Sequence, residues 1–596
     1  MDLRVNLRAV DVIRKITAGE YSKINFVKFE PWKKSFSKDV PYKQPFPRST
    51  PEEQGISSKL VSSFLSELTR TPETCVHSFM ILRNGNVIAE GSFAPYKQEI
   101  WHISNSLCKS IVALAVGIAM DEGRLTLDSK LNDLLKNRKV PVSAKLKRDI
   151  TVKHLLTMTS GLYANESVAA TENEWTKVLL ESGQRFNPGT KFHYNSMNTY
   201  LLSVILTEVT GESVMDYIRP RLLEPMGIDR IAWEKSPEGI EKGGWGMYIT
   251  LEDMAKFGQL CLQRGEWKGK QLVPARWIEE MAKFRMDSTG GKGMYGYGYH
   301  VWLGKRAGSF IFNGMLGQIV YVIPDLKMVF AFTGGSENLY RDNATNFLIE
   351  KYFDEHFSGE VLKPDLNAAK ALKKQCKTIA YVSSDDYLTE KYGVMLRGCS
   401  RKDMRMNALK LCDKSYSVSE TTVGLFPLYV QCIHNNYSKG ISKLNFKNLS
   451  DRFFFEVVEG DDINSFPVGF EEPEYTTIHE NGEEFNVAVI GTMDVNEDRE
   501  TILKIAIHFL ETVNVRIIKF RFTNRYTSVK FYETPSVEMI LDSIDSVAPK
   551  LGGTSTMLNN AINKIDPDIA EAVVRYAFEP KLKLTEIGPG AEEKTK

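Results

Sequence analysis

The segment that most limits what this chain can fold into runs from Trp101 to Gly123. After a polar start, its residues are apolar almost all round a helix, which is typical of a helix buried on every side. Ser104 or Asn105 is a suitable N-cap, and Gly123 is a suitable C-terminal stop. We therefore expect a central helix with the rest of a domain folded around it.

A lysine interrupts this apolar helix close to its start. Lys109 follows Ser106 by three residues, so the two side chains share one face and the lysine lies a turn deeper. A buried lysine is costly without partners, and loss of hydration lowers its pKa. A serine hydroxyl needs a neighbouring base to act as a nucleophile, and the N–H groups at a helix start favour an oxyanion. The pair predicts a nucleophilic Ser106 activated by Lys109.

The sequence around this pair resembles a known family. The run Ser106-Leu-Cys-Lys-Ser-Ile, continuing to Asp121-Glu-Gly-Arg-Leu, is similar to the active-site helix of class C-type β-lactamases and related serine hydrolases. These relatives include esterases, D-aminopeptidases, D-Ala-D-Ala carboxypeptidases and 6-aminohexanoate-dimer hydrolases. The resemblance covers about residues 50 to 340, and further motifs follow in family order at Ile150–Leu162, Pro188–Leu202, Gly243–Leu260, Gly265–Gln271 and Gly314–Gln318.

The resemblance implies roles for particular residues. Tyr194 matches the family tyrosine whose oxygen faces the serine and assists proton transfer. The backbone N–H groups of Ser106 and Gln318 would form the oxyanion hole. Ser196 and Gly317 would line the substrate cleft. Whether Lys109 or Tyr194 is the base during acylation stays open.

Two positions depart from the family pattern. Ser196 stands where the tyrosine motif often has asparagine, and a serine hydroxyl can still donate a hydrogen bond, although with a shorter reach. Met315-Leu316-Gly317 replaces the common Lys-Thr-Gly or His-x-Gly, so no cation is present to bind a substrate carboxylate. We therefore expect ester or amide substrates without that carboxylate.

The fold expected for the chain is α/β (α+β), with an antiparallel sheet flanked by helices and interrupted by a helical insertion, as in the β-lactamase/transpeptidase type. Asn84-Gly85 between two apolar runs predicts a hairpin, and strands within 296–335 should join the same sheet. Three parts are expected: residues 1–50 as an extended N-terminal arm with one short helix, 51–360 as the hydrolase domain, and 380–596 as a β-rich domain ending in helices near 535–547 and 555–576. The last domain would shape the cleft, bind a partner or support an oligomer.

Composition narrows the function further. A net charge of +1 gives no footprint for nucleic acid, and the longest apolar run is about half a membrane span. The histidines and the seven scattered cysteines show no metal-ligand spacing, and no nucleotide-binding motif occurs, so no metal or other cofactor is expected. The unpatterned cysteines, with no evident signal peptide, favour free thiols and a cytoplasmic location. The expected partner is a small-molecule ester or amide, with no nucleic acid or membrane partner.

The sequence gives less support to other catalytic arrangements. A Ser-His-Asp arrangement with His102 or His193 is disfavoured because no Gly-x-Ser-x-Gly elbow is present, and Cys108 is better read as a packed thiol. The predicted activity is hydrolysis through an acyl-enzyme on Ser106. The rival functions are a true β-lactamase or D-Ala-D-Ala carboxypeptidase, and a non-catalytic binding or sensor protein that keeps the fold.

Overall fold

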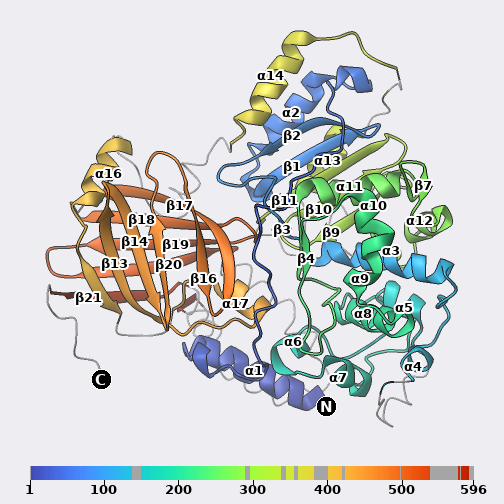
Figure 1. The fold of residues 1–596 in the computed structure, drawn as a ribbon, viewed down its shortest axis with the longest axis horizontal. Helices are drawn as coiled ribbons and strands as arrows, with labels where there is room; N and C mark the ends of the chain where they lie inside the picture. The colour runs from blue at the N-terminus through green and yellow to red at the C-terminus, as the bar shows by residue number, and fades with distance from the viewer. Residues whose placement is uncertain are drawn as a thin grey trace. The chain divides into compact units, whose positions relative to one another are not determined.

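The computed structural model describes residues 2–136, 138, 149–288, 295–336, 344–354, 357, 360–380, 401–418, 423–496, 498–536, 575–576 and 579–588. The chain divides into two compact units, each with its own hydrophobic core (Figure 1). Unit 1 comprises Met1–Arg8 and Phe26–Ser383, and unit 2 comprises Ala9–Asn25 and Ser384–Lys596. The predicted helices near 535–547 and 555–576 lie almost entirely outside the described residues.

Unit 1 is built on a six-stranded antiparallel sheet with the order β2-β1-β11-β10-β9-β8. Asn84 and Gly85 both have a positive φ and make the tight turn of the predicted hairpin. The hairpin joins the later strands through β1 and β11, so the predicted antiparallel sheet is confirmed. The strands are β1 (Val76–Arg83), β2 (Asn86–Ser92), β8 (Trp302–Leu303), β9 (Phe310–Gly314), β10 (Gln318–Ile323) and β11 (Met328–Gly334).

A hydrophobic core covers each face of this sheet, and its inner strands β10 and β11 are mostly apolar and buried at every position. Along β1, Phe79 and Ile81 belong to one core, whereas Met80 and Leu82 belong to the other. The first core includes residues of α2 (Ser58–Leu68), α13 (Ala344–Tyr352) and α14 (Leu366–Lys377). The second includes residues of α3 (Cys108–Asp121), α8 (Met197–Thr210) and α11 (Leu251–Leu262).

The expected central helix is α3, and its residues are buried from Cys108 to Ala119. Gly123 ends it in a left-handed conformation, as predicted. Its start differs from the prediction. Ser106 lies in a short 3₁₀ turn, η4 (Asn105–Leu107), directly before α3, and no side chain caps the turn or the helix.

The region between β2 and β8 is mostly helices and loops, as the sequence indicates. Its remaining helices are α4 (Leu131–Leu134), α5 (Val152–Leu156), α6 (Ser167–Thr171), α7 (Trp175–Glu181), α9 (Val214–Ile218), α10 (Glu224–Met226) and α12 (Ala275–Met281). A three-stranded sheet joins β3 (His102–Ile103), β5 (Met247–Ile249) and β4 (Ile231–Trp233), and β6 (Glu266–Trp267) pairs with β7 (Lys270–Gln271). The pairing of β3 with β5 holds the segment that leads into Ser106.

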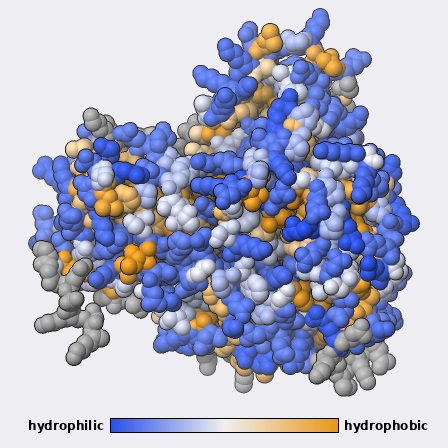
Figure 2. All heavy atoms as spheres, in the orientation of Figure 1, coloured by the Kyte–Doolittle hydropathy of each residue, from blue (hydrophilic) through white to orange (hydrophobic). Residues whose placement is uncertain are grey.

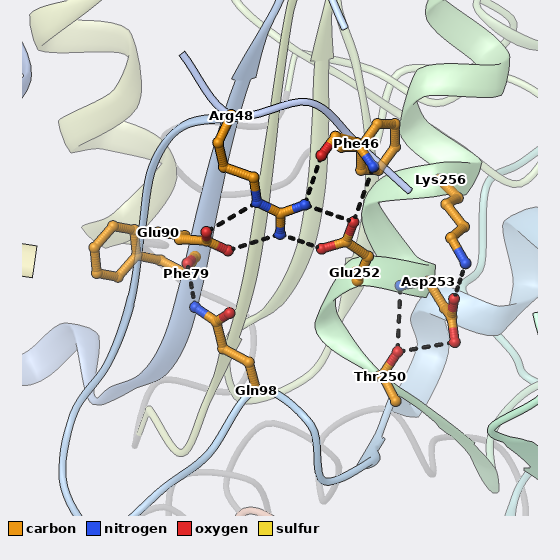
Figure 3. A network of polar contacts seen from close by, with 9 residues as sticks. All are labelled: Phe46, Arg48, Phe79, Glu90, Gln98, Thr250, Glu252, Asp253 and Lys256. Carbon is orange, nitrogen blue, oxygen red and sulfur yellow. Dashed lines mark hydrogen bonds and ion pairs between the residues drawn. The ribbon is translucent and has the colours of Figure 1, made fainter. Parts of the chain in front are cut away.

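The N-terminal segment contains the helix α1 (Asp2–Thr17), which is longer than the one short helix expected there. Further on, Arg48 fixes the chain in unit 1 (Figure 3). Its guanidinium donates to both carboxylate oxygens of Glu90 on β2 and, at 2.7 Å, to Glu252 on α11. Burial raises the pKa of Glu252, and the ion pair with Arg48 opposes that rise. Arg48 therefore neutralises a buried carboxylate while it ties three segments together.

Unit 2 is β-rich, as predicted. Its ten-stranded antiparallel sheet has the order β15-β14-β13-β12-β21-β20-β19-β18-β17-β16. The two end strands meet, because the Asn464 amide on β15 donates to the His479 carbonyl on β16 and accepts from the His479 N–H. The sheet therefore nearly closes into a barrel around an interior rich in phenylalanine.

The strands of unit 2 are β12 (Ser415–Val418), β13 (Ile441–Leu449), β14 (Arg452–Glu459), β15 (Asp462–Pro467), β16 (Glu474–Glu480), β17 (Glu483–Val495), β18 (Thr501–Phe509), β19 (Val515–Phe522), β20 (Thr527–Thr534) and β21 (Lys581–Ile587). Its helices include α16 (Arg401–Leu409) and α17 (Leu428–His434). Asn481 and Gly482, which both have a positive φ, form the turn that joins β16 to β17.

The surface drawn in Figure 2 is mostly hydrophilic, with small apolar areas between charged side chains. Among the described residues, no helix combines the length and the apolar character that a membrane crossing requires.

Candidate active site

The site begins at the 3₁₀ turn that leads into α3. Ser106 is partly exposed, whereas Lys109 is 1% exposed on the first turn of the helix. The Lys109 Nζ lies 2.8 Å from the Ser106 Oγ and donates to the Gly244 carbonyl at 2.6 Å. The ammonium group is thus fixed between the serine hydroxyl and a backbone oxygen, with the serine facing outward.

Burial lowers the affinity of Lys109 for its proton. Loss of hydration lowers the pKa of Lys109 to about 8, although Cys108 and Glu166 act to raise it. A lysine with such a pKa is partly neutral near physiological pH, and its lone pair can then accept the Ser106 proton. The local structure therefore places a lysine with a lowered pKa beside Ser106, where the sequence predicts a base.

Tyr194 lies on the other side of this pair, in the loop before α8. Its ring stacks on Trp302 with the centroids 5.6 Å apart, and the Lys109 Nζ lies 5.1 Å from the tyrosine ring centroid. Burial raises the pKa of Tyr194, and a side-chain hydrogen bond with Ser106 opposes that rise. Tyr194 therefore keeps its proton and can donate it, so the structure brings Ser106, Lys109 and Tyr194 together.

The carbonyl that holds Lys109 depends on a pair of glycines. Gly243 has φ +66°, and an added Cβ there would lie 2.2 Å from the Ser203 Oγ. At Gly244, an added Cβ would lie 2.9 Å from the Ser196 Cβ. Only glycine lets this loop approach the start of α8 so closely. The approach places the Gly244 carbonyl within reach of Lys109.

Met315-Leu316-Gly317, which we call the third motif, forms the turn between β9 and β10, and both strands contact η4. Asn105, with φ +47°, donates from its amide to the Met315 carbonyl at 2.9 Å. An added Cβ at Gly314 would lie 2.3 Å from the Ser104 carbonyl oxygen. The turn is therefore fixed against the backbone that carries Ser106.

The residues assigned to the oxyanion hole and the cleft take distinct positions. Gln318 is buried, and its amide donates to the carbonyls of Leu316 and Gly334, so its side chain supports the turn. Gly317 is partly exposed in that turn. Ser196 is buried at the start of α8. The part played by the Ser106 and Gln318 N–H groups in an oxyanion hole stays a prediction.

Two residues of the site were missed from the sequence. His300 is buried, with its Nε2 3.0 Å from the Thr199 Oγ1, and burial together with the nearby Lys109 lowers its pKa to about 3. It is a neutral polar neighbour of the lysine. Glu166 accepts a hydrogen bond from the Ser196 N–H at 2.6 Å. Both lie in segments without a distinctive motif, so no local spacing could have identified them.

Cys108 and His102, which the sequence disfavours as catalytic residues, are both buried and hydrogen-bonded. Cys108 is buried and donates to the Asn105 and Gly243 carbonyls, and burial raises its pKa to about 12, so it is packed as predicted. His102 is buried with its Nε2 3.0 Å from the Nδ1 of His77. Within the described part of the chain, no three His, Cys, Asp or Glu side chains are arranged to hold a metal ion.

The comparison with protein families agrees with this geometry. Residues 75–346, which contain every residue of the site, match the Beta-lactamase family model. The resemblance drawn from the motifs is therefore confirmed for this part of the chain, which is similar to the Beta-lactamase family.

Individual relatives are more distant. The chain is 25% identical over 234 residues to the 6-aminohexanoate-dimer hydrolase of Paenarthrobacter ureafaciens, and the matched region covers 36% of this chain and 58% of that relative. It is 24% identical over 241 residues to an uncharacterized protein of Alkalihalophilus pseudofirmus, covering 36% and 66%. The match thus spans less than two thirds of either relative. Among solved structures, the D-amino acid amidase of Ochrobactrum anthropi SV3 is 17% identical and covers 50% of this chain and 98% of its own, with a TM-score of 0.40.

Proposed function

We propose that the protein is a serine hydrolase that cleaves an ester or amide bond through an acyl-enzyme on Ser106. The observation that carries this proposal is the 2.8 Å contact between the Ser106 Oγ and the Nζ of a buried lysine whose pKa is lowered to about 8. A serine beside such a base is equipped for nucleophilic attack. A purely structural lysine would more often be paired with a carboxylate.

The reaction can be written from these groups. Neutral Lys109 accepts the Ser106 proton as the Oγ attacks the substrate carbonyl, and a tetrahedral oxyanion forms. When this intermediate collapses, the bond to the leaving group breaks, and the leaving group takes a proton from Tyr194 or Lys109. Water then attacks the acyl carbon, gives one proton to the same groups and releases the acid with free Ser106. The N–H groups of Ser106 and Gln318 would stabilise the oxyanion in both halves.

The substrate class follows from the third motif. Met315 occupies the place where many relatives carry a cation, so an ester or amide without an adjacent carboxylate suits the cleft better than a β-lactam. The similarity to a protein named as a 6-aminohexanoate-dimer hydrolase adds support for an amide or a related bond. True β-lactamase or D-Ala-D-Ala carboxypeptidase activity is the rival, and steady Ser106-dependent hydrolysis of a chromogenic cephalosporin would favour it.

Intact-mass labelling with a fluorophosphonate tests the proposal. We expect one adduct on the native protein, none on Ser106→Ala, and an unchanged adduct on the control Ser66→Ala. The described partners of the Ser66 hydroxyl are the Ser62 carbonyl on α2 and the Gln375 amide. The same three proteins are assayed with p-nitrophenyl esters. A protein that takes no adduct and turns over no ester or amide would instead be a binding or sensor protein with this fold.

A further inference from the structure

A carboxylate stands at the edge of the catalytic group. Glu166, at the start of α6, is exposed, and its Oε1 accepts the Ser196 N–H at 2.6 Å. Ser196 follows Tyr194 by two residues and is the N-cap of α8. Within the described residues this is the hydrogen bond that holds the Glu166 side chain. Its carboxylate is therefore fixed beside the tyrosine loop and still faces solvent.

Close contacts connect this carboxylate to Lys109. Ser196 lies against Gly244, where an added Cβ would come within 2.9 Å of the serine Cβ. The Gly244 carbonyl in turn accepts the Lys109 hydrogen bond at 2.6 Å. In agreement with this placement, Glu166 acts to raise the pKa of both Lys109 and Tyr194. Its negative charge thus reaches both groups that handle protons.

The rest of the site does not offset this charge. Among the described residues, the groups that mainly shift the pKa of Lys109 and of Tyr194 include Glu166 but no lysine or arginine. The third motif contributes Met315 and Leu316, which are uncharged. When Lys109 is neutral, as the attack on substrate requires, the catalytic group carries the net negative charge of Glu166. Such a site attracts cations and repels carboxylates.

We infer that Glu166 is a specificity-determining residue that selects ester or amide substrates carrying a positively charged amine. The inference rests on the proposed hydrolysis at Ser106 and names its substrate class. Glu166 takes no part in bond making. It places one unit of negative charge where a cationic group of a bound substrate is stabilised and a carboxylate is not.

The test compares substrates that differ only in charge. One pair is p-nitrophenyl 4-(trimethylammonio)butyrate and its neutral carbon isostere, p-nitrophenyl 5,5-dimethylhexanoate. The second pair places the charge on the leaving group, as butyrylthiocholine and 3,3-dimethylbutyl thiobutyrate. We expect a higher kcat/KM for the cationic member of at least one pair. Glu166→Gln, whose amide oxygen can still accept the Ser196 N–H, should reduce that preference about tenfold, mainly through KM.

The controls separate this inference from the proposed function. Glu174→Gln removes an exposed carboxylate whose described partner is Lys177, and it should leave the preference unchanged. Ser106→Ala should abolish turnover of the neutral esters, and failure of that result would overturn the hydrolase proposal itself. With Ser106-dependent turnover established, equal kcat/KM within both pairs would overturn the role of Glu166. An equal loss of kcat on charged and neutral substrates in Glu166→Gln would also overturn it, by showing a role in the reaction.

Discussion

At the scale of single residues, the proposed chemistry depends on one lysine that is almost completely buried. In the described part of the chain, the hydrogen-bond partners of Lys109 are the Ser106 hydroxyl and the Gly244 carbonyl, and neither is an anion. A carboxylate in contact would have kept the lysine protonated and unable to accept a proton. Glu166 stays outside hydrogen-bond range, so it moderates the pKa of Lys109 without restoring it to the ordinary value.

The pH dependence of acylation follows from this pKa. Below about pH 8 Lys109 holds its proton and cannot accept another, and above that pH its lone pair is free. We expect kcat/KM for a neutral ester to rise with pH and to level off above an apparent pKa of about 8. The fluorophosphonate labelling rate should follow the same curve.

A second lysine provides a matched control for this profile. Burial lowers the pKa of Lys504 in unit 2 to about 8 as well. Lys504→Met should leave the curve in place, whereas Lys109→Met should remove both the curve and most of the activity. A flat profile between pH 6 and 9 in the native enzyme would exclude Lys109 as the titrating base.

Removing only the Tyr194 hydroxyl tests its part in proton transfer. Tyr194→Phe keeps the ring that stacks on Trp302, so the fold of the loop should be retained. We expect kcat to fall by about 10²–10⁴-fold, the usual contribution of a general acid or base. The control is Tyr352→Phe. It removes a hydroxyl that donates a hydrogen bond to Glu67, and both residues are far from Tyr194 in the sequence. A fall of less than threefold would assign proton transfer to Lys109 alone.

At the scale of structural elements, the loop before β5 matters because it holds the Gly244 carbonyl. In Gly243→Ala, the new methyl group would meet the Ser203 Oγ at 2.2 Å, and the residue would also be strained at φ +66°. We expect a loss of about 2–4 kcal/mol of unfolding free energy, together with slower Ser106 labelling as the carbonyl moves from Lys109.

Gly211→Ala isolates the cost of backbone conformation in that comparison. Gly211 has φ +76° at the end of α8, but nothing lies within 4 Å of an added Cβ. Its replacement should cost about 1 kcal/mol and leave labelling unchanged. Urea denaturation and labelling rates check both variants. Equal effects of the two substitutions would show that close packing at Gly243 does not position the carbonyl.

Local patterns in the sequence predict these elements unevenly. The Asn84-Gly85 turn and the all-round apolar α3 were predictable because turn conformation and burial on every side leave direct marks on residue choice. The 3₁₀ turn at Ser106 was not, because its shape comes from Asn105 binding the carbonyl of Met315, 210 positions along the chain. His300 was missed for the same reason: its neighbours come together only in the folded domain.

At the scale of the whole molecule, the sequence indicates two kinds of domain. It does not indicate how the strands of the second domain pair to form its nearly closed sheet. Alternating residues predict the β-strands of unit 2, and the order of the sheet places β12 beside β21. That pairing joins strands separated by more than 160 residues, with β13 to β20 between them. Alternation sets which face of a strand is buried, whereas the choice of partner depends on the complete interior.

The interior of unit 2 includes an ion pair that provides the last prediction. Arg516 on β19 lies opposite Glu533 on β20, with Nη1 and Oε2 3.0 Å apart, and it also donates to the Gly424 carbonyl. Burial raises the pKa of Glu533 to about 7, which Arg516 and the Leu428 N–H oppose. In Arg516→Met the carboxylate would stay buried without its cation, so we expect a loss of about 3–5 kcal/mol of unfolding free energy.

The double variant Arg516→Met/Glu533→Met removes both charges and should recover much of this loss. Ser106 labelling at 25 °C should be unchanged in both variants, because its described partners all belong to unit 1. A labelling rate that falls while the protein stays folded would show that the interior of unit 2 influences catalysis.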